Sequence, residues 1–283
     1  MSLALNIQLV IFDWAGTTID FGCFAPTDAF IRGFAAFGIA VTIDEVRGPM
    51  GQHKRDHVRA MFQHADIANR WRSTNNREWC ESDVEAVYEE VGRLQLAAIP
   101  ANCSLVPGLL SVIDSLRSRG LKIAGNTGYF REAAEICYRI ALQQGYQPDY
   151  MICADEVPQG RPAPWMVFRA MEALNIYPSA KVIKVGDTVA DVHEGCNAGA
   201  WSVAVTDSSS EMGLTLDEWT RLTEVERDSR RSAIRDKMFQ AGAHAVIYTL
   251  SELPSLIDII NHSMSSGGKF VVPTRLQYPT TSH

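Results

Sequence analysis

The sequence lacks the features that mark several large classes of protein. Its six cysteines show no CxxC spacing, which argues against a zinc site or a disulfide framework and favours reduced thiols. No apolar run approaches the roughly 18–20 residues of a membrane span, and the N-terminus lacks the basic and then apolar pattern of a signal peptide. The formal net charge is −7, which disfavours nonspecific binding to nucleic acid. We therefore expect a cytoplasmic protein with no membrane or nucleic-acid partner.

What the sequence does contain indicates an α/β protein. The 283 residues, 46% of them hydrophobic and 21% charged, suit one large globular domain or two modest ones. Short apolar runs, each followed by turn or polar residues, are typical of buried strands: LVIFDW, LKIAGNT, YMICADE, VIKVGDT, WSVAVTD and AHAVIYTL. Helical patterns lie between most of them, as in PGLLSVIDSLRSRG, which begins with proline and ends with glycine. This alternation predicts a doubly wound parallel sheet.

One long interval lacks a clear strand. Residues 22–102 show only helical patterns, among them PTDAFIRGFAAFG and ESDVEAVYEEVGRLQLAAI. We therefore predict a helical domain at 22–102, inserted into an α/β core formed by residues 1–21 and 103–263. Residues 264–283 are rich in Ser, Gly, Pro and Thr, which predicts a loose C-terminal extension.

Polar side chains follow several of the predicted strands, at the sheet edge where open α/β sheets bind ligands. Asp13 follows the first strand, Thr127 ends a later one, Asp187 follows another with Asp191 one helical turn on, and Arg161 precedes a helix. A carboxylate can attack phosphorus to form an aspartyl phosphate, while Thr127 and Arg161 could hold the phosphoryl oxygens. Mg²⁺ bound by Asp13 and Asp187 would remove the repulsion between nucleophile and phosphoryl group. Any one such Asp is more often a helix N-cap, but their conjunction favours phosphoryl transfer.

The order Asp13, Thr127, Arg161, Asp187 with Asp191 resembles the haloacid dehalogenase superfamily of phosphotransferases. The resemblance implies a haloacid dehalogenase-like core, with residues 22–102 as that family's helical cap domain. The third motif of the family usually carries lysine, and Arg161 resembles the variant of one branch.

An acid is missing where typical phosphatases of that superfamily have one. In FDWAGTT, Ala15 stands two residues past Asp13. In those phosphatases an aspartate at this position protonates the leaving group and later activates the hydrolytic water, and Ala15 can do neither. Either the chain is a noncatalytic phosphate-binding module, or its leaving group needs no proton from position 15.

The stretch PMGQHKRDHVRA supports the second alternative. Lys54 stands at the start of a predicted helix, with His57 on the same helical face. The positive end of the helix dipole and the neighbouring His53 and Arg55 disfavour the ammonium form, so we expect a lowered pKa for Lys54, and a further fall if the cap closes and buries it. A neutral lysine can form an imine with an aldehyde. If the scissile bond is a C–P bond one carbon from that aldehyde, a neutral enamine departs and no acid is needed at position 15.

FDWAGTTIDFGCFAP, PMGQHKRDHVRA, TGYFRE, DEVPQGRPAPWM and IKVGDTVADVHEG closely resemble the phosphonatase branch of this superfamily, from about residue 7 to about residue 261. The resemblance implies hydrolysis of a small phosphonate, phosphonoacetaldehyde, to acetaldehyde and phosphate with Mg²⁺ as cofactor. It also implies a homodimer formed through the cap. The Phe-rich helix near residues 22–35 is a candidate contact for the dimer, although that face could equally be ordinary core.

The resemblance further implies roles for individual residues. Asp13 is the nucleophile and Lys54 the imine-forming lysine. Ala15, through its backbone carbonyl, joins Asp13 and Asp187 as Mg²⁺ ligands, and Asp191 orients that site. The predicted substrate-binding and supporting residues are Thr127, Arg161, His57, Cys23, Met50, Gly51 and Tyr129. The competing enzyme is an ordinary phosphomonoesterase, which would leave its alkoxide unprotonated and lose acid–base help of about 10²–10⁴ in rate.

Overall fold

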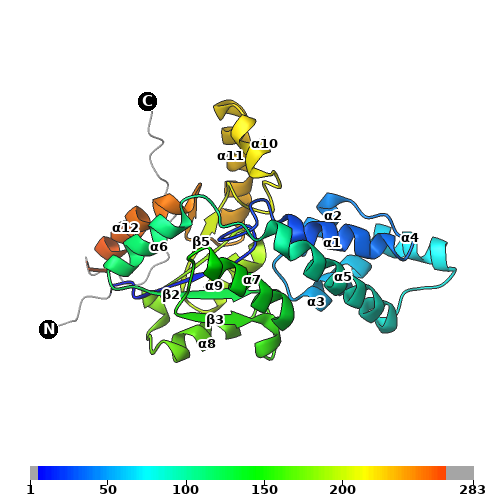
Figure 1. Cartoon of the computed structure of the whole chain (residues 1–283), viewed down its shortest axis with the longest axis horizontal. Coiled ribbons are helices and arrows are strands. Elements are labelled where there is room, and N and C mark those ends of the chain that lie inside the picture. The colour runs from blue at the N-terminus through cyan, green and yellow to red at the C-terminus, as the bar shows by residue number, and fades with distance from the viewer. Residues whose placement is uncertain (1–5, 266–283) are drawn as a thin grey trace.

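The protein is described by a computed structural model that covers residues 6–265. Six parallel strands form one sheet in the order β3-β2-β1-β4-β5-β6 (Figure 1). The strands are β1 (Leu9–Phe12), β2 (Lys122–Thr127), β3 (Tyr150–Cys153), β4 (Val182–Gly186), β5 (Trp201–Val205) and β6 (Ala245–Ile247). Each one falls within a run predicted from the sequence, and the predicted α/β fold with a parallel sheet is confirmed.

Helices cover both faces of the sheet, which explains why its strands read as almost unbroken apolar runs. On β1, Val10 and Phe12 pack in a cluster with the helices of one face, whereas Leu9 and Ile11 pack with α8 on the other. The first face carries α6 (Leu109–Ser118), α7 (Arg131–Gln143) and α12 (Leu253–Ser265). The second carries α8 (Trp165–Ala173), α9 (Val189–Asn197) and α11 (Glu224–Gln240).

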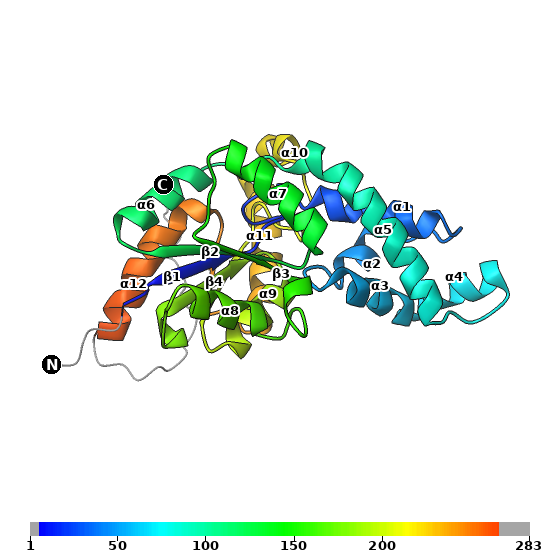
Figure 2. The same cartoon turned by 60° about the horizontal axis from the view of Figure 1, so that its bottom comes forward.

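Five helices are inserted between β1 and α6. They are α1 (Phe24–Ala35), α2 (Ile43–Arg47), α3 (Lys54–Gln63), α4 (Ala65–Asn75) and α5 (Glu81–Asn102). The long helix α5 packs on α1 and α3 and also contacts α7. Figures 1 and 2 both show these five helices together at one end of the sheet, opposite α12. We refer to α1–α5 as the cap and to the sheet with its covering helices as the core.

Three helices near the C-terminus were not predicted from the sequence: α10 (Leu216–Arg221), α11 and α12. In α11 only Ile234 and Met238 are buried, so its sequence carries no broad apolar stripe. Helix α12 runs to Ser265, two residues into the segment predicted to be a loose extension. The rest of that predicted extension, residues 266–283, lies outside the described residues.

The dimer contact predicted on the Phe-rich helix stays a prediction, although two of the rings of this helix face inward. Phe30 and Phe34 are fully buried within the chain, where Phe30 stacks on His57 and Phe34 packs against Phe62. These rings are part of the cap's own core, which was the alternative interpretation. The homodimer and the cytoplasmic location also stay predictions.

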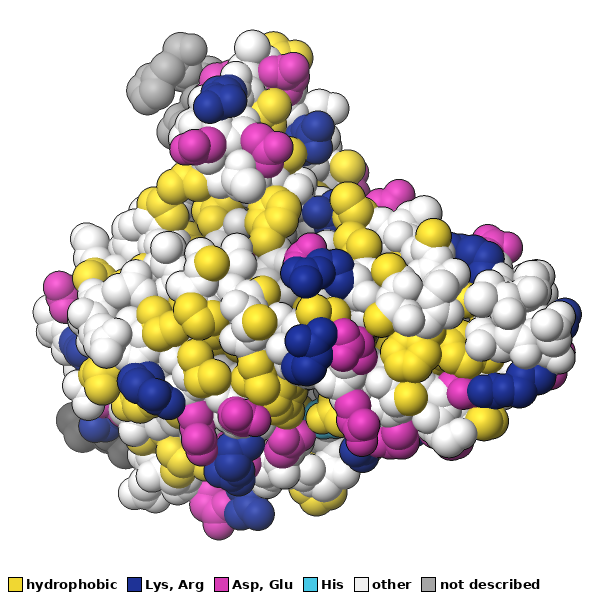
Figure 3. Space-filling view, turned by 45° about the vertical axis from the view of Figure 1, so that its right-hand side comes forward, with side chains coloured by type: hydrophobic (Ala, Val, Ile, Leu, Met, Phe, Trp, Pro, Cys, Tyr) yellow, Lys and Arg dark blue, Asp and Glu magenta, His cyan; other side chains and the backbone are white. Residues whose placement is uncertain are grey.

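Positive and negative side chains are interspersed on the face shown in Figure 3. Between residues 6 and 265, no helix is long and apolar enough to cross a membrane.

Candidate active site

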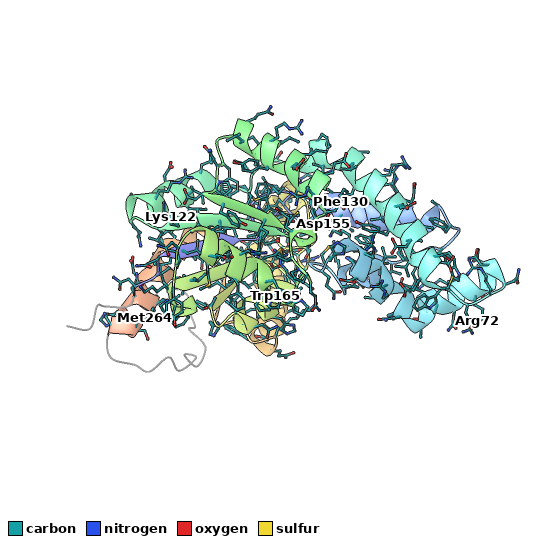
Figure 4. All side chains as sticks on the ribbon, turned by 90° about the horizontal axis from the view of Figure 1, so that it is seen from below. Arg72, Lys122, Phe130, Asp155, Trp165 and Met264 are labelled. Atoms are coloured by element: carbon teal, nitrogen blue, oxygen red, sulfur yellow. The ribbon has the colours of Figure 1, made fainter. Side chains whose placement is uncertain are left out.

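The residues predicted at the strand ends come together at one edge of the sheet. Lys122, at the start of β2, lies at the edge of the sheet that is away from the cap. Asp155, just past the end of β3, lies beside the cap (Figure 4). Asp13 directly follows β1, Thr127 ends β2 and Asp187 directly follows β4. Because β2, β1 and β4 are adjacent and parallel, their carboxyl ends place these side chains next to one another.

A small cavity lies between this edge and the cap. Its volume is about 20 Å³, roughly the space that one water molecule occupies. The residues that line it come from core and cap alike: Asp13, Ala15, Cys23, Pro26, Met50, Gly51, Lys54, Thr127, Gly128, Tyr129, Arg161, Asp187 and Thr188. Of the predicted site residues, only His57 and Asp191 do not line the cavity.

Three buried carboxylates meet on the core side. One oxygen from each of Asp13, Asp187 and Asp191 lies within 4.8 Å of the others. Burial, reinforced by repulsion from Asp13 and Asp191, raises the pKa of Asp187 well above its usual value. Burial also raises the pKa of Asp13, although Arg161 opposes the shift. The pKa of Asp191 is lowered, because Arg161 and Lys184 together outweigh its burial.

This arrangement fits a hard divalent cation. Carboxylate oxygens are the ligands that Mg²⁺ prefers, and a cation would offset the mutual repulsion that raises the pKa of Asp187. Both oxygens of Asp191 are already engaged, Oδ1 by Lys184 Nζ at 2.6 Å and Oδ2 by Thr188 Oγ1 at 2.6 Å. Oδ1 of Asp187, in contrast, has only a 3.5 Å hydrogen bond from Thr17. The geometry therefore favours Asp13 and Asp187 as ligands and Asp191 as a residue that orients the site.

Arg161 and Thr127 lie beside Asp13. Arg161 Nη2 is 2.6 Å from Asp13 Oδ1, and both side chains are almost completely buried. The hydroxyl oxygen of Thr127 accepts a hydrogen bond from the backbone N–H of Tyr129 at 3.2 Å, which leaves its proton able to point into the cavity. Both residues can therefore donate to oxygens of a group that is attacked by Asp13.

Lys54 enters the cavity from the cap. It is the first residue of α3, is only 3% exposed, and its Nζ lies 5.2 Å from the centre of the Tyr129 ring and 5.5 Å from that of Phe30. Burial is the main cause that lowers the pKa of Lys54 to about 8, and Arg161 lowers it further. The amine is thus brought into the range where a substantial fraction is neutral at physiological pH.

The predicted direction of this pKa shift is right, but part of the predicted cause is wrong. Arg55 Nε pairs with Glu85 at 2.9 Å, and His53 Nε2 lies 2.9 Å from Asp155 Oδ1. Neither side chain is among the causes of the lowered pKa of Lys54. Burial under the cap, which was expected only as a further contribution, is the main cause.

His57 lies behind the wall of the cavity. Its ring stacks on Phe30 with 3.8 Å between ring centroids, and its Nε2 is 2.8 Å from the carbonyl oxygen of Val46. Burial, followed by the nearby charge of Lys54, lowers the pKa of His57 well below its usual value. A neutral His57 that packs against Phe30 fits the predicted supporting role, because it shapes the surroundings of Lys54 and is poorly suited to carry protons.

Sequence reasoning missed three buried polar residues that surround Arg161. They are Asn126 at the end of β2, Lys184 inside β4 and Glu194 on α9. A signal for Lys184 was present, because a lysine inside the apolar run VIKVGDT is unusual for a buried strand. Glu194 stands three residues after Asp191, on the same helical face, which also marked it as a neighbour of the site.

Comparison with known proteins decides the family. A family model described as a haloacid dehalogenase-like hydrolase matches residues 7–199. The phosphonoacetaldehyde hydrolases of Bacillus cytotoxicus and Bacillus cereus are 43% and 44% identical to the chain over 256 residues, which cover 90% of this chain and 97% of each relative. The chain belongs to the phosphonoacetaldehyde hydrolase family. It is therefore a hydrolase, and the noncatalytic alternative is excluded.

Solved structures agree with this family assignment. A phosphonoacetaldehyde hydrolase-like protein from Oleispira antarctica superposes with a TM-score of 0.92 at 37% sequence identity, covering 94% of this chain and 96% of that protein. A putative β-phosphoglucomutase from Bacteroides vulgatus superposes with a TM-score of 0.63 at 16% identity, which shows a shared fold alone. The predicted membership of the haloacid dehalogenase superfamily and of its phosphonatase branch is confirmed.

Proposed function

We propose that this member of the phosphonoacetaldehyde hydrolase family cleaves the C–P bond of phosphonoacetaldehyde through an imine on Lys54 and a phosphoryl group on Asp13. One observation carries the proposal: the cavity that holds Asp13 and Arg161 also holds a buried lysine whose pKa is lowered to about 8. A site that only transfers phosphoryl groups has no use for a neutral amine. A substrate with an aldehyde next to its phosphonate uses both the amine, which binds the aldehyde, and the phosphoryl site.

The first step takes place at Lys54. The neutral amine attacks the aldehyde carbon, water leaves, and the resulting imine takes up one proton from solvent to become a protonated imine. Tyr129 and Phe30 face Nζ with their rings, which gives this cation an aromatic environment in place of water. The protonated imine then acts as an electron sink one carbon from the C–P bond.

The second step takes place at Asp13. Its carboxylate oxygen attacks phosphorus, the C–P electron pair moves into the imine, and a neutral enamine is released from phosphorus. Donors from Arg161 and Thr127 hold the phosphoryl oxygens on which charge is concentrated. Protonation of the enamine and hydrolysis of the imine give acetaldehyde, and hydrolysis of the aspartyl phosphate gives inorganic phosphate.

Magnesium fits the same site. We propose that Asp13, Asp187 and the backbone carbonyl of Ala15 hold Mg²⁺ while Asp191, engaged by Lys184 and Thr188, orients them. When bound, the ion would offset the repulsion between the anionic phosphonate and the attacking carboxylate.

The cap must open for turnover. A cavity of about 20 Å³ cannot admit phosphonoacetaldehyde, so we propose that substrate enters when the cap moves and that closure then excludes water. Contacts between cap and core, such as Arg161 Nη1 to the Gly51 carbonyl at 3.4 Å and Arg47 Nη2 to the Gly213 carbonyl at 3.2 Å, would be broken and remade in each cycle.

The competing phosphomonoesterase is disfavoured by Ala15. This residue lines the cavity beside Asp13, where a methyl group cannot protonate an alkoxide. Cys23, Met50, Gly51 and Tyr129 also line the cavity and are proposed to enclose the substrate. Burial raises the pKa of the Cys23 thiol well above its usual value, so we assign it no nucleophilic role.

Trapping the imine tests the proposal. The protein is incubated with Mg²⁺ and phosphonoacetaldehyde, reduced with borohydride, and digested for peptide mass analysis. We expect a reduced adduct on Lys54 with parallel loss of activity, and no adduct in Lys54→Arg. Release of phosphate from an aryl phosphate but not from phosphonoacetaldehyde, with no adduct, would support the phosphomonoesterase instead.

A further inference from the structure

Glu194 is a fully buried carboxylate that the proposed steps do not use. It is 0% exposed and lies on α9, one turn beyond Asp191. Its Oε2 accepts a hydrogen bond from Arg161 Nε at 3.0 Å, and both of its oxygens accept from Asn126 Nδ2, at 3.0 and 2.9 Å. A buried carboxylate is tolerated only where such partners satisfy it. Its position therefore depends on Arg161 and Asn126, and theirs depends on it.

Asn126 connects the two charged groups. Because its amide NH₂ faces a carboxylate that can only accept, its Oδ1 must face the other way. That oxygen accepts from Arg161 Nη2 at 2.7 Å, and the Asn126 backbone carbonyl accepts from the same nitrogen at 2.9 Å. Glu194 therefore sets the orientation of the Asn126 amide, which in turn holds one arm of the guanidinium.

The guanidinium of Arg161 is fixed at all three of its nitrogens. Nε is held by Glu194, Nη2 by Asn126 and by Asp13 at 2.6 Å, and Nη1 by Asp191 at 3.0 Å. A planar guanidinium group that is hydrogen-bonded or ion-paired at all three nitrogens cannot rotate within its plane. A lysine at position 161 would present no donor equivalent to Nε. Glu194 is thus matched to an arginine at this position.

Lys184 completes the charge balance behind the site. It is fully buried, with Nζ 2.6 Å from Asp191 and 3.7 Å from Glu194. Asp191 and Glu194 therefore each face two cations, Arg161 and Lys184. The two cations hold the pKa of Asp191 below its usual value, and they oppose the rise that burial causes in the pKa of Glu194.

We propose that Glu194 and Asn126 are positioning residues, which hold the guanidinium of Arg161 in the plane that receives the phosphoryl group. The proposal deepens the proposed function and rests on it, because the phosphoryl group is assigned to Arg161 there. Loss of either residue leaves Arg161 in place but free to tilt, and misplacement of about 1 Å can cost 10²-fold in rate.

Inorganic phosphate serves as the probe, because it presents the same oxygens without the aldehyde. Its affinity is measured by titration calorimetry in Mg²⁺ for the wild type, Glu194→Gln, Asn126→Ala and their double variant, together with kcat and KM. Asp83→Asn is the matched control. Asp83 is another buried carboxylate, 7% exposed, and it accepts hydrogen bonds at 2.6 Å from Nη1 and Nη2 of Arg77. It lies in the cap and does not line the cavity.

We expect phosphate to bind at least tenfold more weakly to both single variants, with kcat lowered by roughly 10–10². The double variant should be little worse than either one, and trapping of the Lys54 imine should be unchanged. Asp83→Asn should lower the melting temperature but leave phosphate affinity within twofold. If Glu194→Gln does not fold, Glu194→Asp serves in its place. It keeps the negative charge but shortens the side chain by one methylene, and we expect an intermediate loss of phosphate affinity and kcat.

Two results separate the failure of this proposal from that of the proposed function. Unchanged phosphate affinity and kcat in the Glu194 and Asn126 variants, with only a lower melting temperature as in Asp83→Asn, would overturn the positioning role. Absence of phosphonoacetaldehyde turnover in the wild type would overturn the proposed function, and the phosphate affinities would still decide the positioning role.

Discussion

The Nε2 atom of His53 lies 2.9 Å from Oδ1 of Asp155, a bond that joins the cap to the core next to Lys54. The Nδ1 atom of His53 accepts from the backbone N–H of Arg55 at 3.3 Å, so Nε2 carries the proton that is donated to Asp155. The other oxygen of Asp155 accepts from the backbone N–H of Arg131 at 2.9 Å. The start of the helix that carries Lys54 is therefore tied to the carboxyl end of β3.

Breaking this bond should make Lys54 easier to reach. A hydrogen bond to a charged, partly exposed carboxylate contributes roughly 1–2 kcal/mol, which corresponds to a change of about 5–30-fold in an equilibrium. His53→Ala and Asp155→Ala should each speed acetylation of Lys54 by acetic anhydride by about this factor. Arg55→Ala is the control, because its partner Glu85 lies within the cap. Equal rates in all three variants and the wild type would show that the bond does not hold the cap closed.

The pH dependence of imine formation follows from the lowered pKa of Lys54. Only the neutral amine attacks an aldehyde, so the rate of imine formation should rise with pH up to about 8 and then level off. Burial also disfavours the ammonium form in the folded protein alone, so from about pH 8 up to the ordinary lysine pKa of 10.5 this group adds stability as the pH rises. Borohydride trapping at a series of pH values measures the midpoint. A midpoint near 10.5 would contradict the structural explanation.

The strand-end residues could be predicted because one rule governs them. Parallel strands end at the same edge, so Asp13, Thr127 and Asp187 had to meet once six apolar runs were recognised as strands. The fold and the residues that line the cavity follow from that rule and from the family resemblance. Their chemical roles are predictions that the trapping and substitution experiments test.

The extent of tertiary burial and the partners it brings together, in contrast, could not be seen in the sequence. Burial of Lys54 was expected only to add to the effects of the helix dipole, His53 and Arg55, whereas burial by residues distant in the chain is the main cause of its low pKa. Asn126 and Glu194 are 68 residues apart and become partners only when β2 and α9 pack together. Helix α11 was missed because a charged, largely exposed helix has little apolar periodicity.

Replacing Ala15 by aspartate should restore the motif of a phosphatase but harm this enzyme. Ala15 lines a cavity that already contains Asp13 and Asp187, and a further anion there would stabilise the ammonium form of Lys54. We expect Ala15→Asp to turn over phosphonoacetaldehyde at least tenfold more slowly and to shift the midpoint of imine trapping above pH 8. Ala15→Asn adds the same bulk without charge, so it should slow turnover but leave the midpoint unchanged. Identical midpoints in both variants would exclude an electrostatic effect.

Magnesium should stabilise the fold through Asp187. The pKa of this carboxyl is raised by burial and by two neighbouring carboxylates, so the ion-free site is strained by repulsion. A ligand at 100 times its Kd stabilises a protein by about 2.7 kcal/mol, so MgCl₂ should raise the Tm of the wild type. Asp187→Asn removes both the repulsion and a metal ligand. In the absence of Mg²⁺ we therefore expect this variant to have a higher Tm than the wild type, and we expect MgCl₂ to raise its Tm no further. A Tm that rises equally with MgCl₂ in both proteins would place the ion elsewhere.

Gly51 should be required for closure of the cap rather than for folding. Its φ is +88°, and a Cβ there would lie 2.3 Å from Thr188 Oγ1, the group that donates to Asp191 at 2.6 Å. Gly120 has a similar φ of +77° but open space around it, so Gly120→Ala measures the backbone strain alone, about 1–2 kcal/mol. Because Gly51 is in the cap and Thr188 in the core, the clash can be relieved by opening the cap. Urea denaturation should therefore show similar losses for Gly51→Ala and Gly120→Ala, while kcat/KM falls by about 10² only in Gly51→Ala. A much larger loss of unfolding free energy in Gly51→Ala, with activity per folded molecule retained, would instead make Gly51 a structural residue.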